Sequence, residues 1–289
     1  MDLGVKDKAF AIVGGVSGMG LDTARLLAAE GAKVALIGRN RERGDPRAKA
    51  LAQEFEADVR MFVADGTVKG SMDSAMEEVA GCFGRLDGLC VTAGTLQTRK
   101  TLLELDDEDW DAYFQAHVMV TVRANRAALP HIIAAGGGTV VNTAAYSIRA
   151  MKPPLLGYTT MKAAIAMVTK NIALTYGPQN VRANTVCPGF IASASAERVM
   201  QVAAEKYGLP PLEAINKAMK EDFKMDVALG RIGLSTEIAD LFAFLLSERA
   251  GYLTGQRSIA TGARNSKHPS PASGETARAC AGKQQSSLR

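Results

Sequence analysis

The chain has few residues of the kinds that bind metal ions or form cross-links. Its 289 residues include three histidines and four cysteines, and the cysteines show no paired spacing of the metal-binding type: Cys82, Cys90, Cys187 and Cys280. Cys90 and Cys187 lie in apolar stretches, where a thiol packs as a small hydrophobic group. We therefore expect no metal site and no disulfide.

Long hydrophobic runs are absent as well. The sequence has no stretch of about 18 apolar residues, and residues 1–8 are too polar for a secretory signal. We therefore expect no membrane partner and a cytoplasmic location. With 47% hydrophobic and 22% charged residues, the chain can form a substantial core in one domain.

The excess of positive charge is confined to the C-terminal end. Residues 264–289 account for the whole net charge of +4, because they hold five basic residues against Glu275: Arg264, Lys267, Arg278, Lys283 and Arg289. The neutral remainder argues against nucleic-acid binding as the main role. The end segment is rich in Ser, Ala and Gly without apolar periodicity, which predicts one domain at 1–263 and a disordered basic tail at 264–289.

A glycine-rich turn connects the first predicted strand, residues 9–13, to the helical pattern of 21–30. Such a turn brings backbone N–H groups and the positive end of a helix to a pyrophosphate. The spacing G-x3-G-x-G differs from the commoner G-x-G-x-x-G, and a glycine run can also be a plain turn. The candidate dinucleotide-binding residues here are Gly14, Ser17, Gly18, Met19 and Gly20.

Arg39 follows the second predicted strand, residues 33–38, where many dinucleotide-binding folds have an acid that binds ribose hydroxyls. An arginine at this point accommodates a 2′-phosphate, so the sequence favours NADP(H), with NAD(H) as the alternative. A solvated loop arginine would give the same pattern, and the glycine turn holds no basic residue to reinforce Arg39.

Tyr158 and Lys162 stand four residues apart at the start of a stretch with helical periodicity, so both face one side of a helix. A neighbouring ammonium favours the phenolate and lowers the pKa of a tyrosine from ~10 toward neutrality, where the phenol can act as an acid. The same spacing also arises by chance, from a solvated lysine near a packed tyrosine. The pair is a candidate proton donor.

Several ordered motifs resemble the short-chain dehydrogenase/reductase family. They are the glycine turn, the Tyr-x3-Lys pair, Asp65 after a third predicted strand, Ala93-Gly94 after a fourth and Pro188-Gly189 after a sixth. The resemblance spans residues 5–263. It implies one Rossmann-type, doubly wound α/β domain with a seven-stranded parallel sheet and helices on both faces, which the alternation of predicted strands and helices also favours.

The resemblance also implies a role for each matching residue. Asp65 would hydrogen-bond the adenine, and Ala93 and Gly94 would lie beside the adenosine ribose. Lys162 would hold the nicotinamide ribose and lower the pKa of Tyr158, which would protonate the substrate's carbonyl oxygen. Homodimers or homotetramers are implied too. The residues implied to face the nicotinamide are Pro188, Gly189, Ile191 and Ser193.

One departure from the family pattern is Ala145, which stands where the family has a serine that helps to hold the substrate oxygen. Alanine donates no side-chain hydrogen bond, and loss of one such donor costs on the order of a hundredfold to a thousandfold in rate. Thr143 and Ser147 are candidate replacements, because residues two apart lie on the same side if the strand continues.

A second departure is His117, which stands where the family has an asparagine that anchors a proton-relaying water. It lies on a helix predicted to begin near Asp106, with an apolar stripe at Trp110, Phe114, Val118 and Val122. An imidazole can relay protons, so His117 joins Tyr158 and Lys162 as a catalytic candidate. A packed core histidine is the alternative.

The sequence therefore predicts an NAD(P)(H)-dependent oxidoreductase that interconverts a secondary alcohol and a ketone or other carbonyl compound, with Tyr158 as acid/base. The alternative is a cofactor-binding protein with little or no catalysis and a regulatory or scaffolding role. Apolar residues between 192 and 228 would cover the site and favour an apolar carbonyl or alcohol. They are Met200, Val202, Tyr207, Leu209, Leu212, Ile215, Met219, Phe223 and Met225.

Overall fold

The fold is known from a computed structural model that describes residues 2–94, 100–151, 153–193, 196–223, 225 and 227–263. A parallel seven-stranded sheet has the order β3-β2-β1-β4-β5-β6-β9. The strands are β1 (Ala9–Val13), β2 (Lys33–Gly38), β3 (Val59–Val63), β4 (Gly88–Val91), β5 (Gly138–Thr143), β6 (Val181–Pro188) and β9 (Arg257–Ala260). The strand order reverses between β1 and β4, which leaves a crevice beyond their carboxyl ends. The tail at 264–289, with Cys280, lies outside the described residues.

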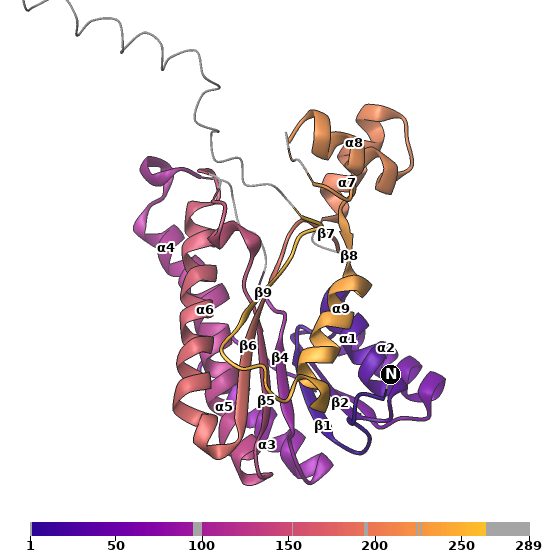
Figure 1. Cartoon of the computed structure of the whole chain (residues 1–289), viewed down its shortest axis with the longest axis vertical. Coiled ribbons are helices and arrows are strands. Elements are labelled where there is room, and N and C mark those ends of the chain that lie inside the picture. The colour runs from indigo at the N-terminus through magenta and orange to yellow at the C-terminus, as the bar shows by residue number, and fades with distance from the viewer. Residues whose placement is uncertain are drawn as a thin grey trace, which may run out of the picture.

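Helices cover both faces of the sheet (Figure 1). One face carries α1 (Gly18–Ala29), α2 (Arg41–Phe55) and α9 (Ser235–Leu246); the other carries α3 (Ser71–Phe83), α5 (Val120–Ala134) and α6 (Leu156–Tyr176). Strand side chains alternate between the two layers, since Phe10 packs in the α1–α9 layer and the next residue of β1, Ala11, in the α3–α5 layer. Burial on both faces explains the continuous apolar runs in the strands. The predicted doubly wound α/β fold is confirmed.

A small helical lid stands beyond the carboxyl ends of the strands (Figure 1). It contains α7 (Glu197–Tyr207) and α8 (Pro211–Glu221), and β7 (Ile191–Ala192) pairs in parallel with β8 (Gly233–Leu234) at its base. Ile215 and Met219 form a core within the lid. These two residues were expected to cover the substrate, and that expectation was wrong for them because α7 and α8 bury them against each other.

The helix predicted from Asp106 is interrupted by one wide turn. Asp106 caps α4 (Asp107–Tyr113) by accepting a hydrogen bond from the Asp109 N–H at 2.8 Å, as its acidic first turn predicts. A π-helical turn, Phe114–Met119, then joins α4 to α5. The turn shifts the helix phase, so Tyr113 is buried and Phe114 is 41% exposed. The predicted apolar stripe was therefore wrong at Phe114.

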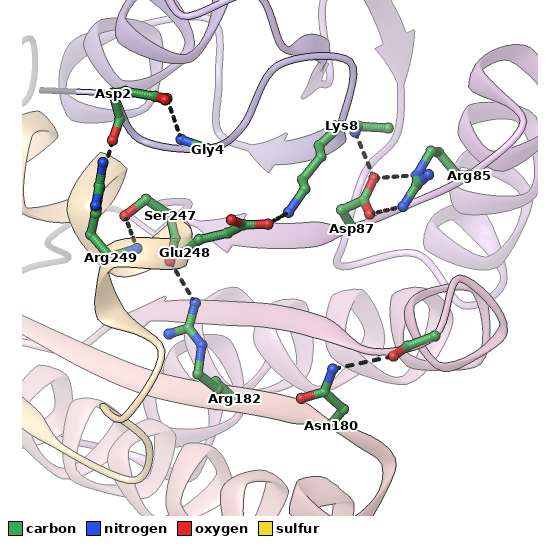
Figure 2. Close-up of polar contacts among 12 residues, drawn as sticks. Asp2, Gly4, Lys8, Arg85, Asp87, Asn180, Arg182, Ser247, Glu248 and Arg249 are labelled. Carbon is green, nitrogen blue, oxygen red and sulfur yellow. Dashed lines mark hydrogen bonds and ion pairs between the residues drawn. The ribbon is translucent and has the colours of Figure 1, made fainter.

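Polar contacts tie the elements together at the opposite, amino-terminal edge of the sheet (Figure 2). The Asp87 carboxylate accepts the Ala9 N–H at 2.8 Å and a two-pronged ion pair from Arg85. Arg182, at the start of β6, donates to the carbonyl oxygens of Leu245 and Ser247 at the end of α9. No helix among the described residues is long and apolar enough to cross a membrane.

Candidate functional site

The turn between β1 and α1 can be built only with glycine at two of its positions. Gly14 has a φ of +86°, in the left-handed region. A Cβ at Gly20 would lie 2.5 Å from the Gly14 carbonyl oxygen and 2.6 Å from Thr92 Oγ1. The Thr92 hydroxyl also bonds the Val13 carbonyl at 3.1 Å, which fastens β4 to the end of β1.

The start of α1 fits a phosphate group. The helix begins at Gly18, and the side chain of Ser17, its extended N-cap residue, makes no capping hydrogen bond. Among the described residues, a Cβ at Gly18 would approach only the Ser193 Cβ, at 3.6 Å, so space remains between the glycine turn and Ser193. Backbone N–H groups at the positive end of a helix favour an anion in such a space.

Arg39 and Asp65 lie at the carboxyl ends of neighbouring strands, β2 and β3. Asp65 Oδ1 accepts hydrogen bonds from the Thr67 hydroxyl at 2.7 Å and the Thr67 N–H at 2.9 Å. The Thr67 hydroxyl is the main cause that lowers the pKa of Asp65, and the positive charge of Arg39 adds to it. Arg39 is exposed next to Asn40, which caps α2 by accepting the Arg43 N–H at 2.9 Å. This position suits an added phosphate charge.

Tyr158 and Lys162 lie on the first two turns of α6, as the sequence predicts. Lys162 is buried, donates to the Thr143 carbonyl at 3.1 Å, and lies 5.6 Å from the centre of the Tyr158 ring. Burial lowers the pKa of Lys162 to about 8, against a smaller opposing effect of Cys187. Burial raises the pKa of Tyr158 to about 12, and Cys187 adds to this increase. In the protein alone, burial therefore outweighs the lowering effect expected from Lys162.

The π-helical turn brings His117 to this pair. His117 is buried, and its ring meets the Tyr158 ring edge-on with 5.4 Å between centres. A Cβ at Gly94 would lie 2.7 Å from His117 Nδ1 and 3.5 Å from Lys162 Nζ, so both side chains adjoin the loop after β4. The three predicted catalytic candidates are thus neighbours in space.

A cavity of about 500 Å³ opens above the carboxyl ends of the strands. Predicted cofactor residues and predicted catalytic residues share its walls: Met19, Gly94, Pro188, Gly189, Ile191 and Ser193 with Tyr158 and Lys162. Ala145 and Ser147 line it too. The other predicted residues are not part of this lining: Gly14, Ser17, Gly18 and Gly20 of the glycine turn, and Arg39, Asp65, Ala93 and His117.

The sequence missed part of the cavity wall. Phe190 lines the cavity and meets Phe223 of the lid edge-to-face, with 6.3 Å between ring centres. Phe190 follows the Pro188-Gly189 turn directly, which was the available signal. Leu155 and Asp222 also line the cavity, and neither had a distinguishing pattern. Phe223 and Met225 lie on the cavity as predicted for the cover.

The fold and the site together define a dinucleotide-binding α/β protein with a tyrosine–lysine pair in its crevice. A family model described as enoyl-(acyl carrier protein) reductase matches residues 14–262. The short-chain reductase protein NovJ of Streptomyces niveus is 31% identical over 265 residues, 91% of this chain and 96% of that protein. The 3-oxoacyl-[acyl-carrier-protein] reductase FabG of Thermotoga maritima is 29% identical over 253 residues, 87% of this chain and 95% of that protein.

A solved structure is similar over the same length. The L-sorbose reductase of Gluconobacter frateurii, complexed with NADPH and L-sorbose, superposes with a TM-score of 0.84 at 30% identity, and the match covers 91% of this chain and 98% of that one. The chain belongs to the short-chain dehydrogenase/reductase family.

Proposed function

We propose that this protein is an NADP(H)-dependent oxidoreductase that interconverts a secondary alcohol and a ketone. The observation that carries this proposal is the single cavity whose walls hold both the cofactor-type residues and the Tyr158–Lys162 pair. Ligands of doubly wound sheets bind in this crevice, and hydride transfer needs the substrate beside the nicotinamide.

The cofactor would be held by the glycine turn and by the ends of four strands. Gly14, Gly18 and the start of α1 suit the pyrophosphate, and Asp65 suits the adenine. Arg39 suits the 2′-phosphate of NADP(H), and the NADPH bound by the similar L-sorbose reductase supports this preference. NAD(H) would lack this contact.

Tyr158 would donate its proton to the carbonyl oxygen during reduction. Burial holds the pKa of Tyr158 at about 12, so the phenol keeps its proton at neutral pH and can act as the acid. When bound, the reduced nicotinamide supplies the hydride. Lys162 places its ammonium beside Tyr158 and would favour the phenolate that forms when the proton leaves.

His117 would help to return a proton to this pair. Its imidazole adjoins Gly94 together with the Lys162 ammonium and contacts the Tyr158 ring. An imidazole can accept and donate a proton through its two nitrogens. We therefore assign His117 the relay position that an asparagine and a water hold in the family.

The substrate would be a neutral and largely apolar carbonyl compound. Leu155, Phe190, Val199, Phe223 and Met225 supply apolar surface to the cavity. Among the described lining residues, Lys162 is the only basic one, and it is held by Thr143. The described part of the wall therefore offers no cation other than Lys162 to bind a carboxylate or phosphate on the substrate.

We also propose that the protein assembles as a homodimer or homotetramer. Met167 and Leu174 project from α6 with 68% and 69% of their surface exposed. They are seven residues apart and so lie on one face of the helix, where burial against a second copy would be favourable. Light scattering of the purified chain measures the assembly directly.

Tyr158→Phe tests the proposed activity. The full-length protein is assayed with NADPH and a panel of aliphatic, alicyclic and aromatic ketones. We expect turnover in the wild type and a loss of at least about a hundredfold in kcat for Tyr158→Phe, because the phenylalanine fills the same space without a proton to give. NADPH affinity, measured by fluorescence titration, should stay within a few-fold. Unchanged turnover in Tyr158→Phe would falsify the acid/base assignment.

A further inference from the structure

The proposed reaction needs a second donor for the substrate oxygen. Negative charge develops on that oxygen as the carbonyl is reduced. Removal of one preorganised hydrogen-bond donor beside such an oxygen lowers the rate on the order of a hundredfold to a thousandfold. Ala145 lines the cavity at the place where the family has such a donor, and its methyl group cannot supply one.

Thr143 is not available for this task. Its hydroxyl donates to the Val91 carbonyl at 2.7 Å, which ties β5 to β4, and its own carbonyl accepts the Lys162 ammonium at 3.1 Å. A hydroxyl has a single proton to donate. Turning the Thr143 hydroxyl toward a substrate would break the contact between the two strands and leave the Val91 carbonyl without that partner.

Ser147 has the opposite character. The chain leaves β5 at Thr143 and forms a 3-10 turn, Tyr146–Ile148, which is fixed by a hydrogen bond from the Arg149 N–H to the Tyr146 carbonyl at 2.9 Å. Within the described residues, the Ser147 hydroxyl is buried and has no hydrogen-bond partner. The residue lines the same cavity as Tyr158.

A buried hydroxyl without a partner costs about 1–3 kcal/mol in stability, so its presence needs an explanation. The Thr159 hydroxyl is also buried without a partner in the described part of the chain, but it does not line the cavity. Because Ser147 lines the cavity, rotation about its Cα–Cβ bond can turn this orphaned hydroxyl toward a ligand there.

We propose that the Ser147 hydroxyl donates a hydrogen bond to the substrate oxygen beside Tyr158 and replaces the donor that Ala145 lacks. The inference rests on the proposed oxidoreductase function. Tyr158 transfers its proton to the oxygen, while Ser147 keeps its own proton and stabilises the developing negative charge. The 3-10 turn after β5 thereby moves the donor two residues along the chain.

The test compares wild type, Ser147→Ala and Ser147→Ala/Ala145→Ser with NADPH and the ketone panel. We expect Ser147→Ala to lower kcat by about tenfold to a thousandfold, with unchanged NADPH affinity, because one oxyanion donor is lost. Its melting temperature should stay the same or rise, since the change removes a hydroxyl that has no partner in the fold. Ala145→Ser should restore part of the rate in the Ser147→Ala background by supplying a donor at the family position.

Thr160→Ala is the matched control. It removes a hydroxyl on α6 that is exposed and bonds the Leu156 carbonyl at 2.9 Å, so kcat should not change. If Tyr158→Phe abolishes turnover and Ser147→Ala leaves it intact, the role of Ser147 is overturned and the proposed function stands. A loss in Tyr146→Phe with no loss in Ser147→Ala would transfer the role to Tyr146 and overturn the proposal. Absence of turnover in the wild type would overturn both.

Discussion

Lys162 is a cationic side chain with almost no contact with solvent. It is 3% exposed, and its ammonium donates a hydrogen bond to the Thr143 carbonyl. Desolvation disfavours the charged form, which is the cause of its lowered pKa of about 8. The protein therefore gives up stability to keep a charge beside Tyr158, as is common at functional sites.

Lys162→Met should stabilise the protein at pH 7 and abolish its activity. The folded state has the lower lysine pKa, so unfolding takes up protons between pH 8 and 10.5, and wild-type stability rises with pH in that window. Methionine has no such charge to bury. We expect Lys162→Met to gain about 1–3 kcal/mol in the free energy of unfolding at pH 7. The difference in this free energy between the variant and the wild type should narrow as pH rises from 8 to 10.5.

Urea unfolding at a series of pH values measures this gap. Lys170→Met on the exposed side of α6 is the control, and it should stay within about 0.5 kcal/mol of the wild type at each pH. If the difference in the free energy of unfolding between Lys162→Met and the wild type widens as pH rises, the assignment of a buried ammonium is contradicted.

At the scale of elements, the proposed preference for NADP(H) rests on the turn from β2 to α2. Arg39 directly follows β2, and the N–H groups at the start of α2 come after it. Arg39 and Asp65 follow the neighbouring strands β2 and β3, and the positive charge of Arg39 adds to the lowering of the Asp65 pKa that the Thr67 hydroxyl mainly causes. A 2′-phosphate would find a cation and a helix N-terminus together here.

Arg39→Asp should therefore weaken NADPH binding selectively. We expect its Kd for NADPH to rise about tenfold to a hundredfold, since a charge-assisted hydrogen bond is worth about 1.5–3 kcal/mol. The Kd for NADH should change by no more than a few-fold. Fluorescence titration of both nucleotides gives the comparison, and Arg25→Asp on α1 controls for the same reversal of charge elsewhere. Equal losses for both nucleotides would rule out a 2′-phosphate contact.

The regular elements could be predicted from the sequence, but two irregular turns could not. Alternation of apolar runs and helical patterns identifies the β-α units, because each run must bury both faces of a strand. A π-helical turn leaves no such mark, and it moved Phe114 to the surface and Tyr113 into the interior. The strand also stops at Thr143, so the two-residue alternation used to place Ser147 does not extend to it.

A buried polar network beneath the site was equally hidden. Asn125 of α5, Asn142 of β5 and Thr169 of α6 are joined by hydrogen bonds of 3.0 to 3.3 Å. The partners are separated by 17 and 27 residues, so no local pattern reveals them. Asn142 precedes Thr143, and the network therefore fixes the strand whose carbonyl holds Lys162.

On the scale of the whole molecule, the cavity and the charged contacts that join the elements lie at opposite ends of the strands. The cavity lies beyond the carboxyl ends of the strands, and the charged contacts in Figure 2 lie at the amino ends. There, Lys8 pairs with Glu248, and Arg182 crosses from β6 to the end of α9. Helix α9, which packs against α1, is thus anchored at the end of the sheet opposite to the cavity.

Arg182→Met should lower stability without altering the chemistry. The Arg182 guanidinium donates to the carbonyls of Ser247 at 2.9 Å and Leu245 at 3.1 Å, both at the C-terminal end of α9, where helix carbonyls lack partners of their own. Hydrogen bonds from a charged group contribute about 1.5–3 kcal/mol, so we expect a loss of about 2–3 kcal/mol in the free energy of unfolding.

Arg60→Met, which removes an exposed ion pair with Asp58, is the control and should lower the free energy of unfolding by no more than about 1 kcal/mol. Urea unfolding ranks the two variants, while kcat per folded molecule should match the wild type in both. A larger loss for Arg60→Met than for Arg182→Met would show that the anchor of α9 lies elsewhere.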